Sequence, residues 1–346
     1  MTTFLQLHLL TAYPPANLNR DDTGQPKTAL FGNHLRLRVS SQSLKRAWRS
    51  SAVFAEALEG HLGRRTQRLG KLLLDALVAE GVDTAAAFNA AVAVAGRFGK
   101  MKPEKDPNPT FIEQLAFVSP EEQSSALALA RRLAAGETIE VKAEPLLQAA
   151  DGAVDIAMFG RMLADSPDFN REAAVQVAHA ITTHRTVVED DYYTAVDDLK
   201  TPAEDAGAGF IGEAGFGAGL FYLYLCIDRD LLVRNLGGRE DLARMGLAAL
   251  ARAAATVAPT GKQASYASRA RASFVLAESG AAAPRTLAAA FLRPVTGDDI
   301  MQRSIEALEE HREKLAAAYG DAPEHVAMDA HAGRGTLDDV VALVAR

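Results

Sequence analysis

The sequence predicts an α+β fold, and three observations support this prediction. Residues 220–227 (LFYLYLCI) form a short run of apolar and aromatic side chains, which is typical of a buried strand. Residues 41–58 repeat apolar side chains at the spacing of a helix. The predicted elements follow the order strand, helix, strand, strand, helix, strand, which is the order of a ferredoxin-like sheet.

The first elements lie between residues 4 and 58. Residues 4–12 partly alternate apolar and polar side chains, and residues 34–39 alternate strictly, so both are predicted strands. In the second strand the alternation separates an apolar group from a basic one: Leu35, Leu37 and Val39 against His34, Arg36 and Arg38. Ser40 or Ser41 can cap the helix that follows. Its apolar stripe consists of Leu44, Ala47, Trp48, Ala52, Ala55 and Leu58.

The remaining elements are predicted from shorter signals. An alanine-rich region at about 60–180 is predicted to be mostly helical, and residues 154–159 (VDIAMF) within it are predicted to form a strand. A glycine run at 207–219 precedes the strand at 220–227. A helix at 239–257, a strand at 272–277 and helices at 298–318 and 336–345 complete the chain.

Composition narrows the class of protein. Hydrophobic residues make up 48% of the 346 residues and charged residues 23%, as in ordinary globular proteins. No apolar run approaches the roughly 18–20 residues that span a bilayer, and no secretory signal is visible. Cys226 is the single cysteine, which excludes an internal disulfide and a cysteine zinc cluster. We therefore expect a cytoplasmic protein without membrane contacts.

Charge is distributed unevenly along the chain. The net charge is −7, yet residues 27–71 hold ten Lys and Arg residues against two acidic ones, a local balance of +8. A basic island on an acidic protein is typical of a face that binds a polyanion.

The helix predicted at 41–58 begins inside this island. Lys45 and Arg49 are one helical turn apart, Arg46 lies beside them, and free backbone N–H groups are expected at the N-terminus. These groups together suit a phosphate. Further cations could extend the site along a nucleic-acid backbone: Arg20, Lys27, Arg36 and Arg38. The alternative interpretation is a capped helix with a solvated basic face.

Two other motifs favour structural roles. The glycine run does not fit GxGxxG and precedes a strand, so a flexible hinge is favoured over a nucleotide-binding loop. His179 and His184 lie five residues apart in AHAITTH, which does not match a helical zinc pair, so structural histidines are favoured.

An acidic segment near residue 190 carries exposed aromatic residues. Its carboxylates could bind Mg²⁺, although a solvated acidic hairpin is favoured; they are Glu189, Asp190, Asp191, Asp197 and Asp198. Tyr192 and Tyr193 could stack on bases or pack against protein. Met162 is either a core residue or a flexible wedge against a base.

Catalytic motifs are weak. The sequence has no GxSxG, and Ser41-Gln42-Ser43-Leu44 does not satisfy SxxK. The alternative function left open is an RNA-processing endonuclease, in which His8 or His34 would act together with Lys45.

Several strings in order resemble the backbone subunit of type I-E CRISPR Cascade, the CasC family. They are LNRDD at 18–22, Lys27 with Phe31-Gly32, RLRVSSQSLKRAWR at 36–49, VDIAMFGRM at 154–162, AHAITTH at 178–184, YYTAVDDL at 192–199, LFYLY at 220–224 and GKQASYAS at 261–268. The resemblance extends to about residue 275 and is poor through 60–150.

The resemblance implies a right-hand shape. A ferredoxin-like (RRM-like) palm would comprise residues 1–59 and 181–346, with a helical fingers insertion at 60–180 and a thumb hairpin at about 186–218. Copies would stack along guide RNA, each thumb folding over the RNA on its neighbour's palm. The expected partners are crRNA, target DNA by way of the guide, further copies, the large and small subunits, CasD and CasE. No cofactor, metal or catalytic activity is expected.

The resemblance also assigns roles to residues. The RNA backbone would be held by Arg20, Lys27, Ser40, Gln42, Lys45, Arg46 and Arg49. Met162 would wedge at the palm, and Tyr192, Tyr193 and Thr194 would act at the thumb, where the family pattern has Trp-Phe before the threonine. Lys262 and Gln263 are weaker candidates.

Overall fold

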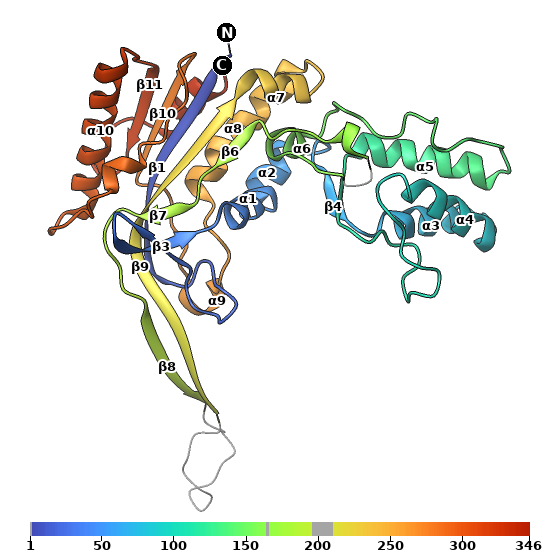
Figure 1. Ribbon diagram of the computed structural model, residues 1–346, viewed down its shortest axis with the longest axis horizontal. Coiled ribbons are helices and arrows are strands. Elements are labelled where there is room, and N and C mark those ends of the chain that lie inside the picture. Colours follow the sequence, from blue (N-terminus) through green and yellow to red (C-terminus); the bar gives the residue numbers. More distant parts are fainter. Residues whose placement is uncertain (1, 164–165, 196–209) are drawn as a thin grey trace, which may run out of the picture.

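The computed structural model describes residues 2–163, 166–195 and 210–346. A twisted antiparallel sheet forms the centre and carries helices on both faces (Figure 1). A group of helices projects from one side of this body, and a long two-stranded hairpin extends from its lower end (Figure 1). The predicted α+β class is confirmed.

The sheet has the strand order β11-β10-β1-β9-β7-β3-β2, and β6 and β8 also pair with β9. These strands are β1 (Phe4–Ala16), β2 (Thr28–Phe31), β3 (His34–Val39), β6 (Val175–Val177), β7 (Ala180–Thr182), β8 (Glu189–Ala195), β9 (Phe210–Asp228), β10 (Phe274–Gly280) and β11 (Glu324–Asp329). The central run β10-β1-β9-β7 reproduces the ferredoxin-like arrangement of four strands in the order fourth, first, third, second.

Alternation along β1 creates two cores, one on each face of the sheet. Leu5, Leu7 and Leu9 are buried against one group of helices, whereas Leu10 belongs to a cluster on the other face. The first face is covered by α1 (Ser41–Arg49), α2 (Ala52–Ala57), α7 (Arg229–Asn235), α8 (Glu240–Thr256) and α11 (Leu337–Val344). The second is covered by α10 (Ile300–Tyr319) and the 3₁₀ turn η2 (Ala288–Phe291).

The helices at the side of the body have a hydrophobic core of their own. They are α3 (Leu69–Ala79), α4 (Thr84–Ala95) and α5 (Pro120–Ala134), joined to a small sheet of β4 (Arg64–Thr66) and β5 (Ala116–Val118). Leu73, Leu77 and Val94 are among the residues buried in this core. The chain returns toward the sheet through α6 (Val154–Phe159) and η1 (Pro167–Phe169).

The prediction of a strand at 154–159 was wrong, because this segment is helix α6. Its residues Val154 to Met158 are all buried, so no polar face showed a helical period. Gly160 ends the helix with φ of 79°, a conformation that favours glycine. The second strand of the ferredoxin-like order is instead supplied by β6 and β7.

The single helix predicted at 41–58 is divided in two. Ser50 Oγ donates to the Arg46 carbonyl, and Ser51 caps α2 by accepting from Phe54 N. The break turns Phe54 into the core and leaves Ala52 exposed, contrary to the predicted stripe.

The glycine run was predicted to be a flexible hinge, but its described part belongs to strand β9. Three of its glycines, Gly215, Gly217 and Gly219, make room for neighbouring side chains. A Cβ on Gly217 would meet Leu37, and one on Gly219 would meet Thr182. These glycines therefore permit close strand packing at the root of the hairpin. Residues 196–209 of the predicted thumb, including Asp197 and Asp198, lie outside the described residues.

Within the described part of the chain, none of the helices is both long and apolar enough to cross a bilayer.

Candidate nucleic-acid interface

Helix α1 begins with the predicted serine cap. Ser40 Oγ accepts a hydrogen bond from Ser43 N at 3.4 Å, and Ser40 N donates to Asn19 Oδ1 at 2.9 Å. Gln42 is exposed on the first turn, and Ser41 Oγ donates to its Oε1. Asn19 was missed by the sequence analysis. Its side chain connects the helix N-terminus to the loop that precedes β2.

That loop, residues 17–27, is folded by its own polar groups. Asp21 Oδ1 accepts hydrogen bonds from Thr23 N, Thr23 Oγ1 and Gln25 N, and these bonds lower the pKa of the Asp21 carboxyl. Arg20 pairs with Pro26 across the loop and is exposed. Lys27 N donates to the Asn19 carbonyl. The loop therefore holds Arg20 and Lys27 beside the start of α1.

Basic side chains from three elements gather at this point. Burial lowers the pKa of Lys45. Burial and the charges of Arg38, Lys27 and Lys45 also lower the pKa of His179, so all three cations lie close enough to act on this imidazole. Arg38 Nη1 lies 2.8 Å from His179 Nδ1. His179, which the sequence analysis interpreted as structural, is exposed within this basic cluster.

Arg36 does not join the cluster, although its alternation predicted that it would. It is fully buried, and its guanidinium donates to the Thr182 and Phe291 carbonyls. Burial lowers its pKa. The segment around η2 covers this end of β3, so Arg36 links β3 to β7 and η2 and is removed from the predicted phosphate track.

Arg46 and Arg49 differ in their surroundings. Arg46 is exposed on α1. Arg49 Nε donates to Asp155 Oδ2 at 3.0 Å, and its guanidinium lies 4.2 Å from the centre of the Phe117 ring. Arg49 therefore connects α1 to the base of the helical insertion.

The loop that leads into helix α9 (Gln263–Tyr266) lies beside the loop at 17–27. A Cβ on Gly261 would collide with the Leu18 carbonyl, which shows how closely the two backbones approach. Gln263 Nε2 donates to the Pro259 carbonyl and so shapes this loop. Lys262 adopts a left-handed conformation with φ of 45°. The structure thus brings Lys262 and Gln263 near the other predicted site residues.

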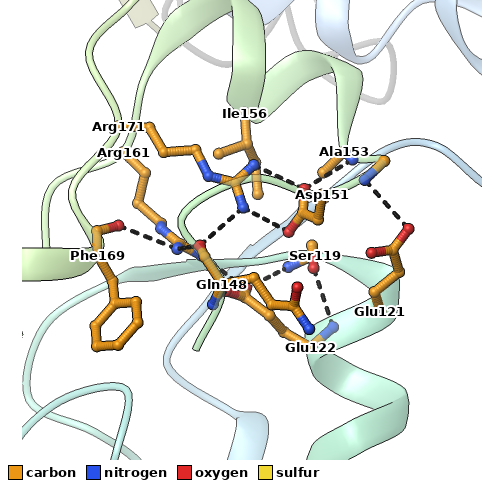
Figure 2. Close-up of polar contacts among 12 residues, drawn as sticks. Ser119, Glu121, Glu122, Gln148, Asp151, Ala153, Ile156, Arg161, Phe169 and Arg171 are labelled. Atoms are coloured by element: carbon orange, nitrogen blue, oxygen red, sulfur yellow. Dashed lines mark hydrogen bonds and ion pairs between the residues drawn. The ribbon is translucent and has the colours of Figure 1, made fainter. Parts of the chain in front are cut away.

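Met162 is 78% exposed, which excludes the core interpretation. It follows Arg161, whose Nη1 lies 2.7 Å from Glu122 Oε2 with both side chains completely buried. Arg171 forms a second buried pair with Asp151 at 2.6 Å (Figure 2). The segment that carries Met162 therefore rests on two buried ion pairs.

Further hydrogen bonds complete this junction (Figure 2). Arg161 Nη2 and Arg171 Nη2 both donate to the Gln148 carbonyl, and Glu122 accepts from Ser119 N in a capping box. These bonds stabilise the buried charges and connect the insertion to the Met162 segment.

The hairpin of β8 and β9 carries the predicted thumb residues. Tyr192 pairs with Glu213, Tyr193 with Gly212, and Thr194 with Ile211. Adjacent residues of a strand point to opposite faces, so Tyr192 and Thr194 share one face and Tyr193 lies on the other.

The root of the hairpin is held between the two loops of the site. Asn17 Nδ2 donates to the Gly215 carbonyl at 2.8 Å, and a Cβ on Gly215 would collide with Gln25. On the opposite face, the Phe216 ring lies 6.1 Å from that of Tyr266. The loop at 17–27 and α9 therefore hold the root of the hairpin in place.

Two other histidines have structural environments. His184 Nε2 accepts from Leu220 N, as the structural interpretation predicted. His8 is fully buried, with Nδ1 2.9 Å from Tyr222 Oη and Nε2 3.3 Å from Glu278 Oε2. His8 is thus closed off from any RNA phosphate, contrary to its imagined role in an endonuclease.

Comparisons with known proteins place the chain in a family. The model of a family described as "CT1975-like protein" matches residues 5–342. A chain of a solved structure described as "CRISPR RNA-guided surveillance complex, pre-nicking" has 30% sequence identity and a TM-score of 0.85, with 99% of each chain covered. A chain of another, described as "CRISPR RNA-guided surveillance complex", has 27% identity and a TM-score of 0.64, with 99% of this chain and 98% of that chain covered. The search of curated proteins found no match.

Proposed function

Because this chain belongs to the CT1975-like protein family, we propose that it is a non-catalytic subunit that binds guide RNA in a CRISPR RNA-guided surveillance complex. The two similar solved chains belong to complexes of that description. The observation that carries the proposal is the basic cluster beside the capped start of α1, where Lys27, Arg38 and Lys45 act on one imidazole.

The chemistry of the cluster suits a strand of any sequence. Phosphate contacts from Lys and Arg position a nucleic acid without reading its bases. A guide carrier must accept every spacer, because base pairing between guide and target reads the sequence. Exposed Met162 and the tyrosines of the hairpin add apolar and aromatic surfaces on which bases could stack.

The finer proposal is a type I-E backbone subunit of the CasC kind, present in several cytoplasmic copies along one crRNA. The hairpin of one copy would close over the RNA on the next copy's palm. Target DNA would be bound by way of the guide, and the large and small subunits, CasD and CasE would complete the particle. The projecting hairpin supports this proposal, because β8 and the part of β9 paired with it extend away from the body of the protein (Figure 1).

The test is to co-express the protein with a guide RNA and measure particle size and the ratio of absorbance at 260 and 280 nm. We expect large particles that contain RNA. The double variant Lys27→Ala/Lys45→Ala should retain less RNA, and the negative slope of log K against log salt should become shallower by about 0.7 for each lost phosphate contact. Lys71→Ala is the matched control, because Lys71 pairs with Asp75 on α3.

A particle without RNA, or an unchanged salt slope in the double variant, would contradict the proposal. Its non-catalytic part is tested by incubation with repeat RNA. Cleavage by the natural chain that is lost in His34→Ala would establish the endonuclease instead.

A further inference from the structure

We propose that His179 and Arg38 act as one unit that binds a phosphodiester of the guide RNA, in which the neutral imidazole fixes the guanidinium and donates through its own Nε2–H. This inference rests on the proposed function, and it adds a site residue that neither the strings of the sequence nor their spacing had assigned.

The hydrogen bond between the two side chains determines the state of the imidazole. A guanidinium can only donate, so Nδ1 of His179, 2.8 Å from Arg38 Nη1, must be the acceptor. The neutral ring then carries its proton on Nε2. His179 is exposed, so this second N–H is available at the surface.

The guanidinium is held at two places. Arg38 Nε donates to the Thr28 carbonyl at 3.2 Å, while Nη1 meets the imidazole. An arginine whose planar group is already oriented loses less conformational freedom when it binds a phosphate. The contacts of Arg38 with the Thr28 carbonyl and with His179 orient its guanidinium in advance, and they therefore favour anion binding.

The sheet brings the pair together. Arg38 of β3 pairs with Ile181 of β7, and Val39 pairs with Ala180, so His179 lies just beyond the last paired residue of β7. Residues far apart in the sequence are thus placed by strand register and not by a loop.

The electrostatic surroundings favour an anion. Burial lowers the pKa of His179, as do the cations that face it: Arg38 from β3, Lys27 from the loop before β2, and Lys45 from α1. Every charged group acting on this imidazole in the described part of the chain is a cation. The ring is therefore neutral at pH 7, and a phosphate bound here would be surrounded by three positive charges and one neutral donor.

The same geometry disfavours general-base chemistry at this position. Nδ1 is occupied by Arg38 and Nε2 carries the proton, so neither nitrogen offers a free lone pair to a 2′-hydroxyl. The pair is suited to binding the RNA backbone and not to cleaving it.

The test compares three forms of the full-length protein in binding a single-stranded RNA of mixed sequence and guide length. His179→Ala should weaken binding about 5- to 10-fold, because Arg38 loses its orienting acceptor and the backbone loses a donor. His179→Asn should recover most of the affinity, since its amide oxygen can replace Nδ1 as the acceptor for Arg38. His325→Ala is the control, because His325 is exposed on β11 at the opposite edge of the sheet.

Two further measurements test the tautomer of His179 and the folding of the variants. Nitrogen NMR of the labelled imidazole should show the Nε2–H tautomer in the natural protein, and circular dichroism should show that each variant is folded. If His179→Ala does not fold, Arg38→Lys decides, because it keeps the charge and removes the oriented fork.

The possible failures are distinguishable. If the natural protein does not bind RNA, the proposed function fails. If it binds RNA but His179→Ala binds with the same affinity, only the role of the His179–Arg38 pair is overturned. The same conclusion follows if His179→Ala does not fold and Arg38→Lys binds RNA as tightly as the natural protein. Equal losses in His179→Ala and His179→Asn would overturn the positioning of Arg38.

Discussion

Arg49 donates from Nε to Asp155 Oδ2 across 3.0 Å, and this bond joins the last turn of α1 to the first turn of α6. Asp155 is almost completely buried and also accepts hydrogen bonds from Gly63 N and Ile156 N. Burial raises the pKa of its carboxyl, while these donors and the charge of Arg49 oppose the rise. Arg49 thus offsets the cost of burying the Asp155 carboxylate at the point where the helical insertion joins the body of the protein.

Removing Arg49 should therefore reduce stability. We expect Arg49→Ala to lower the free energy of unfolding by about 2–3 kcal/mol, because Asp155 would remain buried without its partner. Urea denaturation measures this change. Arg46→Ala is the control on the same helix and should leave the midpoint unchanged, since Arg46 is exposed. Equal midpoints for the two variants would show that the Arg49–Asp155 bond contributes nothing.

The hairpin tyrosines should not be equivalent. Tyr192 and Tyr193 lie on opposite faces of β8, so only one of them can face a given RNA strand. A stacked base contributes roughly 1–3 kcal/mol, so we expect RNA retention by Tyr192→Ala and Tyr193→Ala to differ by at least fivefold. Tyr319→Ala, 78% exposed at the end of α10, is the control. Equal retention by the two hairpin variants would contradict stacking of the RNA on only one of the two tyrosines.

The buried pair of Arg161 and Glu122 should determine the stability of the segment that carries Met162. Arg161→Met leaves the Glu122 carboxylate buried without its cationic partner and should cost about 3–5 kcal/mol of unfolding free energy. Adding Glu122→Gln removes the unpaired charge and should recover a large part of the loss. Arg131→Ala, from an exposed ion pair, is the control. No recovery in the double variant would mean that hydrogen bonds at this junction outweigh its charges.

A second ionic cluster predicts how stability changes with pH. Glu278 is fully buried beneath α10 and pairs with Arg285 at 2.7 Å and Arg312 at 2.8 Å. Burial opposes its ionisation, but the bonds from His8 and Arg285 outweigh burial and hold its pKa well below the usual range. A carboxyl with a lowered folded-state pKa stabilises the fold above its unfolded-state pKa, near 4.5, and this contribution is lost as the pH falls.

Burial lowers the pKa of His8 as well, although Glu278 opposes this effect. The unfolded chain therefore takes up a proton first as the pH falls below 6.5, which also reduces stability. We expect the free energy of unfolding to be constant between about pH 7 and pH 8 and to decrease below this range. Glu278→Gln should lower the plateau by about 3 kcal/mol and flatten the decrease below pH 4.5. Parallel curves for both proteins in chemical denaturation would refute the role of Glu278.

Local patterns were sufficient for several elements. The Ser40 cap, the apolar alternation of β1 and the aromatic run in β9 all appear where periodicity predicted them. The predictions of secondary structure failed where one short sequence signal is compatible with two structures. The segment at 154–159 is buried on every side and lacks a diagnostic period, and the glycines at 215–219 are also compatible with a loop.

The sequence by itself determined which side chains share a face and that cations cluster before and within α1. Only the tertiary structure decided what covers each face. Arg36 and Arg38 belong to the same alternating set, yet Arg36 is buried against the Phe291 carbonyl while Arg38 meets His179 in the basic cluster. The physical reason is that backbone geometry sets the direction of a side chain locally, whereas its solvation and partners depend on segments more than a hundred residues away.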